Sequence, residues 1–156
     1  MIDDTTAMRR AIALSCASVA ACGGPFGAVV VKDGVMVGEG QNRVVPDSDP
    51  TAHAEIVALR AACAALGTHD LTGAVLYTSC EPCPMCLSAA WWARVAAVVY
   101  GNDRHDAAEI GFDDAAIYAE VAAPLAARRL PIRRLLADEA AEGFRLWEEK
   151  SDRVAY

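Results

Sequence analysis

The chain has 156 residues, of which 54% are hydrophobic and 22% are charged, and its formal net charge at pH 7 is −7. This length and composition suit one globular domain with a buried core and argue against a disordered chain. Lysine and arginine form no run longer than two residues. Nucleic-acid binding needs clustered positive charge, so we expect no nucleic-acid partner.

The first predicted element is a helix that includes most of residues 9–22, RRAIALSCASVAAC, and begins a few residues earlier. This stretch also resembles an export signal, but two aspartates precede the arginines, and two serines and a cysteine dilute its apolar part. We therefore expect an amphipathic helix that is capped by Thr5 or Thr6. The face expected to be buried consists of Met8, Ile12, Ser15 or Cys16, and Val19.

No apolar run approaches the roughly 20 residues that a membrane-spanning helix needs. We therefore expect a cytoplasmic protein with no membrane partner. Cytoplasmic thiols stay reduced, so the six cysteines are not expected to form three disulfides. Of these, Cys16, Cys22 and Cys63 are expected to pack as small hydrophobic core residues.

A β-hairpin is predicted over residues 23–42, because two strand-like runs flank Asp33–Gly34, a dipeptide suited to a tight turn. A proline-containing loop then leads to a helix that ends at Gly67. Its expected buried stripe is Ile56, Leu59, Ala62 or Cys63, and Leu66.

Two more strands, over residues 73–79 and 95–101, flank a second helix over residues 84–95. The two strands should be parallel and joined by a right-handed crossover. Further on, residues 113–121 are predicted to be helical, residues 130–136 to form a fifth strand, and residues 137–152 a terminal helix. The order predicts a single domain over residues 1–156, of α/β class, with a mixed five-stranded sheet between two helical layers.

Reactive side chains cluster at the beginnings of two predicted helices. His53 and Glu55 lie at the start of one, and Cys83 and Cys86 at the start of the other. Residues at positions i and i+3 share a helix face, so the two thiols can converge, while His53 and Glu55 can meet them only off the end of their helix. Helix N-termini also favour thiolates.

One nitrogen and two sulfurs make three ligands, which leaves the fourth tetrahedral position of a zinc ion open, as in catalytic zinc sites. Bound zinc lowers the pKa of water to about 7. Glu55, beside the histidine, is then free to move the proton of that water. The pattern H-x-E followed by P-C-x-x-C is the signature of zinc-dependent nucleobase deaminases.

Two other interpretations of the cysteines compete with this one. A lone C-x-x-C is often a redox pair, although such a pair does not explain the upstream His53 and Glu55. Alternatively, Cys80 completes a closed four-ligand structural zinc site, and the protein is then a non-catalytic zinc-binding module.

Beyond the zinc motif, four segments resemble the bacterial guanine deaminases over most of the chain. These segments are GGPFGAVVVKDG, DPTAHAEIVALR, LYTSCEPCPMCLSAAWWARV and GFDDAAIY, at residues 23–34, 49–60, 76–95 and 111–118. The resemblance implies a three-layer cytidine deaminase-like fold and zinc-dependent hydrolysis of guanine to xanthine and ammonia. It also implies one Zn²⁺ per chain and a homodimer, with a C-terminal segment of about 137–156 that can be exchanged between subunits.

The same resemblance assigns roles to individual residues. His53, Cys83 and Cys86 would bind zinc and Glu55 would be the catalytic proton carrier. The substrate contacts that it implies are Asn42, Phe26, Ala54, Trp92, Asp114 and Tyr156. Glu109 is a further candidate for contact with substrate or ammonia, because it is a carboxylate close in sequence to the pocket residues.

Several of these residues have a second interpretation. Asp113 and Asp114 could cap a helix, and Asn42 could be a turn residue at the end of a strand. Trp91 and Trp92 are about 100° apart on a helix, so only one of them can face a pocket. Related deaminases of guanosine, ammeline, another aminopurine or a triazine would share the fold and metal. A tRNA adenosine deaminase shares part of the motif, but the acidic chain suits RNA poorly.

Overall fold

The computed structural model describes residues 1–156 and divides into two units, Met1–Asp114 and Ala115–Tyr156, each of which is described by itself. The first unit contains α1 (Asp4–Ala20), β1 (Gly27–Lys32), β2 (Val35–Gln41), α2 (Val44–Asp47), α3 (Ala54–Leu66), β3 (Val75–Cys80), α4 (Pro84–Trp92), β4 (Ala97–Asn102) and α5 (Arg104–Glu109). The second contains α6 (Ala115–Ala122), the 3₁₀ turn η1 (Leu125–Ala127) and α7 (Ala137–Glu149). No helix is both long and apolar enough to cross a bilayer.

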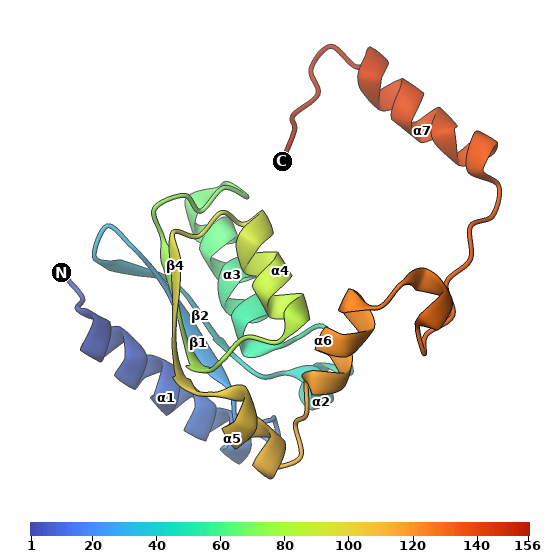
Figure 1. Ribbon diagram of the computed structural model, residues 1–156. Coiled ribbons are helices and arrows are strands. Elements are labelled where there is room, and N and C mark those ends of the chain that lie inside the picture. Colours follow the sequence, from blue (N-terminus) through green and yellow to red (C-terminus); the bar gives the residue numbers. More distant parts are fainter. The chain divides into compact units, whose positions relative to one another are not determined.

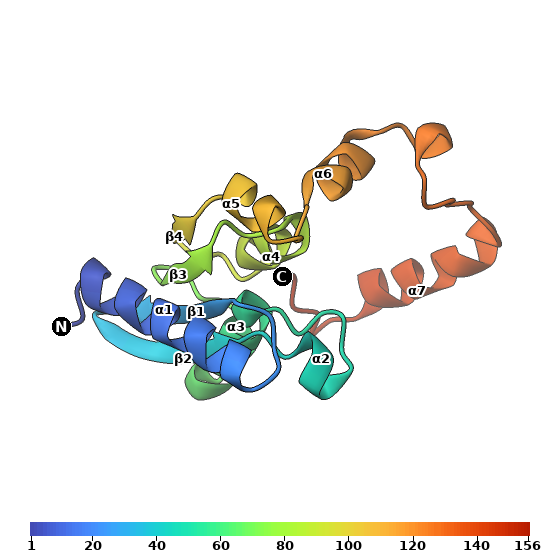
Figure 2. The same ribbon diagram turned by 90° about the horizontal axis from the view of Figure 1, so that it is seen from below.

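The sheet has the strand order β2-β1-β3-β4, in which β1 is antiparallel to β2 and β3, and β3 is parallel to β4. The hairpin of β1 and β2 turns at Asp33 and Gly34, both with positive φ. In both views α1 lies along the sheet, and Figure 1 shows α3 and α4 on the side opposite to α1 (Figures 1 and 2). The predicted hairpin, mixed sheet, parallel β3–β4 pair and three layers are therefore confirmed.

A core cluster fills each side of the sheet. One, on the side of α3, includes Val30, Leu59, Leu71 and Leu76. The other, on the side of α1, includes Val29 and Tyr77. α3 packs closely on β2, because a Cβ atom on Gly40 would lie only 2.2 Å from the carbonyl oxygen of Ala54. A larger residue at position 40 would push away the helix end that carries His53.

The predicted details of α1 are wrong in two respects. Its N-cap is Asp3, whose carboxylate accepts a hydrogen bond from the N–H of Thr6 at 2.7 Å, and not Thr5 or Thr6. Its buried face is formed by Ala7, Ala11 and Ser18, while Ile12 and Val19 are exposed. Small side chains let the helix backbone approach the sheet, so size and not hydrophobicity decides which face is buried.

The predicted fifth strand is also wrong, because the sheet has four strands and residues 130–136 pair with none of them. The carboxylate of Glu120 accepts the N–H groups of Arg129 and Leu130 at 3.0 and 2.8 Å. The next residue, Pro131, has no N–H to donate to a ladder. The predicted helices of this unit are confirmed as α6 and α7.

Candidate metal centre and pocket

The candidate metal ligands lie where two helices begin. His53 is the N-cap residue of α3, and Cys83 is the N-cap residue of α4, with Pro84 at the first helical position. Both residues have extended backbone conformations, and neither side chain caps its own helix. The imidazole and the thiol are therefore not used to cap their own helices. Cys86 lies in the first turn of α4 and is fully buried.

The three donor atoms are spaced as tetrahedral zinc ligands. The Nδ1 atom of His53 lies 3.6 Å from the Sγ of Cys83 and 3.5 Å from the Sγ of Cys86. All three donor atoms lie within 4.8 Å of one another. Zinc–sulfur and zinc–nitrogen bonds at a tetrahedral angle would separate the sulfur and nitrogen atoms by about 3.5 Å. The donor set and its spacing therefore fit zinc, with one coordination position not supplied by these residues.

The two thiols differ strongly in acidity. Hydrogen bonding from Cys86 is the main cause that lowers the pKa of Cys83 to about 4, and His53 acts in the same direction. The pKa of Cys86 is raised, because its proton is shared with Cys83 and because the side chain is buried. The hydrogen bond to Cys83 in turn raises the pKa of His53. Zinc would displace the remaining proton, since thiolates and neutral imidazole are the ligating forms.

Glu55 lies in the first turn of α3, next to the donor set, and its side chain is only 6% exposed. Burial raises the pKa of this carboxyl, the nearby negative charge of Cys83 adds to the shift, and His53 opposes it. A carboxyl with a raised pKa can take up and release a proton near neutral pH. The geometry thus places a proton carrier beside the candidate metal centre.

A pocket of about 50 Å³ opens beside these residues. Phe26 and Phe112 form part of its wall, with ring centroids 4.9 Å apart and planes at 88°. The complete lining is Phe26, Asn42, His53, Glu55, Cys80, Glu81, Cys83, Ala107, Phe112 and Asp114. Aromatic faces, carboxylates and an amide in a small cavity suit a flat polar ring.

Asn42 is buried and held by several bonds. Its side-chain oxygen accepts the N–H groups of Gly24 and Val44 at 3.3 and 3.2 Å, and its carbonyl oxygen accepts the hydroxyl of Ser18 at 3.0 Å. With the amide oxygen occupied, the NH₂ group is what Asn42 can offer to a ligand. Asp114 supplies the opposite polarity, and burial raises the pKa of its carboxyl.

The structure brings together seven of the predicted site residues: Asn42, Phe26, Asp114, Glu55, His53, Cys83 and Cys86. Ala54 is buried beside His53 but does not line the pocket. Glu109, at the end of α5, and Trp92, 61% exposed at the end of α4, do not line it either. Trp92 is six residues beyond Cys86, about 9 Å further along the helix axis. Tyr156 belongs to the second unit.

Four lining residues were not predicted as site residues: Cys80, Glu81, Ala107 and Phe112. Cys80 is buried, as expected of a packing residue, but it also forms part of the pocket wall. Glu81 lies within the motif CEPC and Phe112 within the motif GFDD, which is the signal that could have indicated them. Ala107 carries no such signal, because only the position of α5 brings it to the pocket.

Residues 1–102 match the family described as the cytidine and deoxycytidylate deaminase zinc-binding region. This match covers the sheet, His53, Glu55, Cys83 and Cys86. The chain therefore belongs to this family of zinc-dependent deaminases, and its α/β fold is the cytidine deaminase-like fold.

Similar proteins that match over most of the chain indicate which members of this family the chain resembles. The guanine deaminase of Bacillus subtilis is 49% identical over 152 residues, which are 97% of both chains. An X-ray structure of guanine deaminase from the same organism superposes with a TM-score of 0.95 over 99% of both chains, at 47% identity. A guanine deaminase structure from Nitrosomonas europaea has a TM-score of 0.70 at 40% identity, over 73% of this chain and 66% of that one. Within the family, the chain thus groups with the bacterial guanine deaminases.

Proposed function

We propose that the protein hydrolyses guanine to xanthine and ammonia, with one zinc ion per chain. The single observation that carries this proposal is the pocket itself. It combines a zinc-compatible donor set, a buried carboxyl and two polar groups, Asn42 and Asp114, that match a purine edge. Relatives of the same length that carry the name guanine deaminase support it.

The chemistry is divided among the residues of the pocket. His53, Cys83 and Cys86 hold zinc, which when bound lowers the pKa of a water ligand and so supplies a nucleophile near neutral pH. Glu55 would carry two protons in turn: one from the attacking water to the ring nitrogen, and then one from the hydroxyl group added at C2 to the amine, which leaves as ammonia. The raised pKa of the Glu55 carboxyl suits both halves of this exchange.

Recognition of guanine follows from hydrogen-bond polarity. Guanine carries donors at N1 and at the 2-amino group, which the carboxylate of Asp114 can accept. Its exocyclic carbonyl oxygen and its ring nitrogen acceptors suit the NH₂ group of Asn42. Phe26 and Phe112 enclose the flat ring. A base without donors on that edge would leave the carboxylate of Asp114 desolvated and unpaired, which disfavours its binding.

Ammonia release from a panel of substrates tests this proposal. We expect zinc-loaded protein to release ammonia from guanine with a kcat/KM far above that for guanosine, ammeline, adenine and cytosine. Preference for guanosine or ammeline would reassign the substrate but keep the zinc chemistry. No ammonia from any of the five compounds would contradict the enzyme assignment and favour a non-catalytic zinc-binding module.

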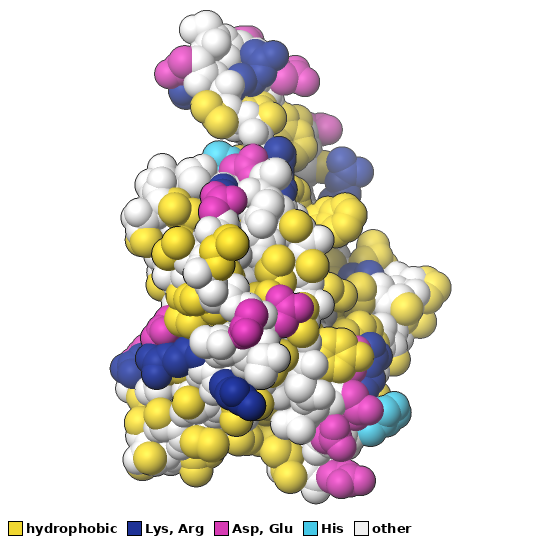
Figure 3. All heavy atoms as spheres, turned by 90° about the vertical axis from the view of Figure 1, so that its left-hand side faces the viewer, with side chains coloured by type: hydrophobic (Ala, Val, Ile, Leu, Met, Phe, Trp, Pro, Cys, Tyr) yellow, Lys and Arg dark blue, Asp and Glu magenta, His cyan; other side chains and the backbone are white.

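We further propose a cytoplasmic homodimer that acts on a small nucleobase and binds neither membrane nor nucleic acid. The face drawn in Figure 3 supports the last point, since its lysine and arginine side chains lie in small groups among acidic ones. Exposed apolar residues of α7, Phe144, Leu146 and Trp147, suit contact with a second copy. We also predict that residues 137–156 are exchanged between the subunits of such a dimer. A further prediction is that the substrate is contacted by Ala54, Trp92, Glu109 and Tyr156. Sedimentation of the zinc-loaded protein tests the dimer.

A further inference from the structure

The pocket contains a third carboxylate, Glu81, which the proposed reaction does not use. Glu81 lies between β3 and Cys83, two residues before that candidate ligand. Its side chain is only 19% exposed, and it lines the pocket together with Glu55 and Asp114. Like charges at such close quarters repel one another, so a neighbouring cation should accompany Glu81.

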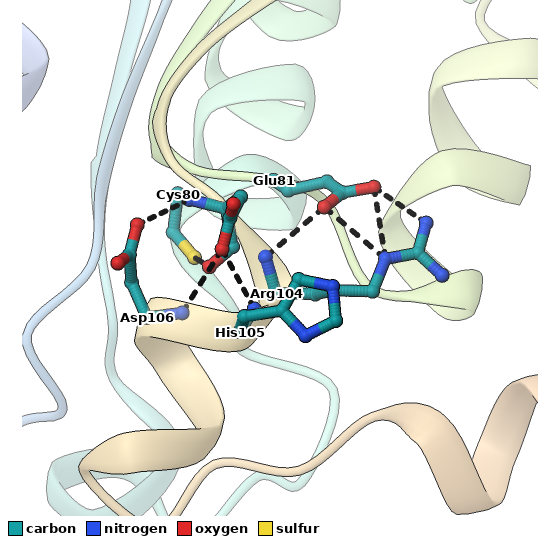
Figure 4. Close-up of polar contacts among 6 residues, drawn as sticks. Cys80, Glu81, Arg104, His105 and Asp106 are labelled. Carbon is teal, nitrogen blue, oxygen red and sulfur yellow. Dashed lines mark hydrogen bonds and ion pairs between the residues drawn. The ribbon is translucent and has the colours of Figure 1, made fainter.

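That cation is Arg104, the first residue of α5. Its guanidinium donates from Nε to both carboxylate oxygens at 3.2 Å and from an NH₂ group to Oε1 at 2.5 Å. Its backbone N–H also donates to Oε2 at 3.0 Å. Figure 4 shows both sets of hydrogen bonds, with the carboxylate of Glu81 between the main-chain nitrogen and the guanidinium of Arg104. The hydrogen bonds from Arg104 lower the pKa of Glu81.

Further contacts attach the same loop to the start of α5. The N–H of Glu81 donates to the carbonyl oxygen of Asn102 at 2.8 Å, and the thiol of Cys80 lies 3.7 Å from the carbonyl oxygen of Asp103. Asp103 caps α5 by accepting the N–H groups of His105 and Asp106, and Asp106 accepts the N–H of Asp103 in return (Figure 4). The N-terminus of α5 is thereby fixed to the loop that carries Cys83.

α5 cannot be held in place by its own packing. It has six residues, and only Ala107 among them is buried. The chain beyond it supplies the opposite wall of the pocket, since the N–H of Phe112 donates to the carbonyl oxygen of Ala107 at 2.9 Å and Asp114 follows two residues later. Arg104 is also near enough for its positive charge to oppose the raised pKa of Asp114.

We propose that Glu81 and Arg104 are a positioning pair, an inference that rests on the proposed function. Their ion pair sets the distance between the loop that carries Cys83 and the pocket wall formed by Ala107, Phe112 and Asp114. Neither residue takes part in proton transfer. Their effect is on the binding of the base, which must reach Asp114 and the candidate metal centre at the same time.

The test substitutes Arg104→Met and Glu81→Gln, which remove the charge while keeping the approximate size of the side chain. We expect each variant to keep one zinc per chain and to raise the KM for guanine by about tenfold or more, with kcat changed by less than about threefold. The double variant should be no worse than the more severe single variant, because both substitutions break the same contact. Arg104→Lys should recover only part of the loss, since lysine keeps the charge without the planar fork.

A matched control joins α1 to β2, outside the pocket. Arg10 donates from Nε to Glu39 at 2.9 Å and from an NH₂ group at 2.5 Å, so this pair has the same chemistry but lies outside the pocket. Arg10→Met and Glu39→Gln should leave the KM, kcat and zinc content of the wild type unchanged.

The outcomes separate this proposal from the one on which it rests. Wild-type protein that fails to deaminate guanine contradicts the proposed function, whatever the variants do. If the wild type is active, an unchanged KM in both variants overturns the positioning role. The positioning role would also be overturned if the increases in KM of the two single variants added in the double variant, or if kcat fell while KM stayed unchanged. Failure of both variants to fold, with the Arg10 and Glu39 controls intact, would show a purely structural pair and would also overturn it.

Discussion

The burial of Tyr77 beside Asp4 should make the stability of the fold fall at alkaline pH. Tyr77 is buried on the α1 side of the sheet, and its hydroxyl donates to a carboxylate oxygen of Asp4 at 2.7 Å. Burial, aided by the charge of Asp4, raises the pKa of Tyr77 to about 12. The neutral phenol is thus favoured in the folded state, while the unfolded state ionises near its usual pKa of about 10.

The sign and size of the effect follow from linkage. Because the folded pKa is raised, the contribution is fully present below about pH 10 and is lost as the pH rises through about 12. The shift of about two units corresponds to at most roughly 2.7 kcal/mol, and water near the partly buried hydroxyl group makes the effect smaller. The Tyr77→Phe variant has no phenol to ionise, so its stability does not fall in this way at alkaline pH. It also lacks the hydrogen bond to Asp4, which stabilises the folded state by about 1 kcal/mol. The variant should therefore be less stable than the wild type at neutral pH and more stable than the wild type above roughly pH 11.

Urea unfolding of the two zinc-loaded proteins, repeated from pH 7 to pH 12, measures this difference. Lysine and arginine titrations are common to both proteins and cancel in the comparison. Tyr100→Phe, at an exposed residue of β4, is the control and should keep the wild-type profile. Parallel stability curves for wild type and Tyr77→Phe, with no crossing, would refute the reasoning.

Three further predictions concern the site and the core. Glu55→Gln should retain zinc, because Glu55 is not a ligand, and should lower kcat by roughly 10² to 10⁴; turnover close to that of the wild type would exclude the proton-carrier role. Cys80→Ser should keep one zinc per chain and Cys83→Ser should not, as elemental analysis will decide, and the reverse pattern would mean that the donor set is misassigned. The hydroxyl of Thr78 is buried without a partner, so Thr78→Val should raise the free energy of unfolding by about 1 kcal/mol in urea titrations. A loss of stability would instead indicate that the hydroxyl is hydrogen-bonded to a buried water.

The parts of the site that were predictable from sequence depend on short spacings. His53 and Glu55 are two residues apart, Cys83 and Cys86 are three apart, and each pair begins a helix. A helix start fixes local geometry within a few residues, so the pattern alone indicates which side chains can converge. The hairpin turn at Asp33 is of the same kind, because its dipeptide specifies the backbone conformation.

The parts that were not predictable depend on distances between packed elements. Phe112, which follows α5, lies against Phe26, and nothing in the sequence pattern of α5 states where this helix docks. The error in the predicted buried face of α1 also concerns the distance between packed elements. Hydrophobic periodicity favoured Ile12, whereas close approach to the sheet requires the small side chain of Ala11. A periodic pattern describes an element but not how near its neighbour lies.

The candidate metal centre belongs to the core as well as to the pocket. Ile56, from the first turn of α3, packs in one buried cluster with Cys83 and Cys86, and Met85 and Ala89 of α4 pack against them. The cluster joins the N-terminal turns of the two helices that carry the donors, so side-chain packing helps to hold α3 and α4 at the separation that the donor atoms show. In small zinc domains, by contrast, the metal supplies most of the folding free energy. Here the hydrophobic contacts of Ile56 also support the positions of the ligands, so the local structure of the site would not depend on zinc alone.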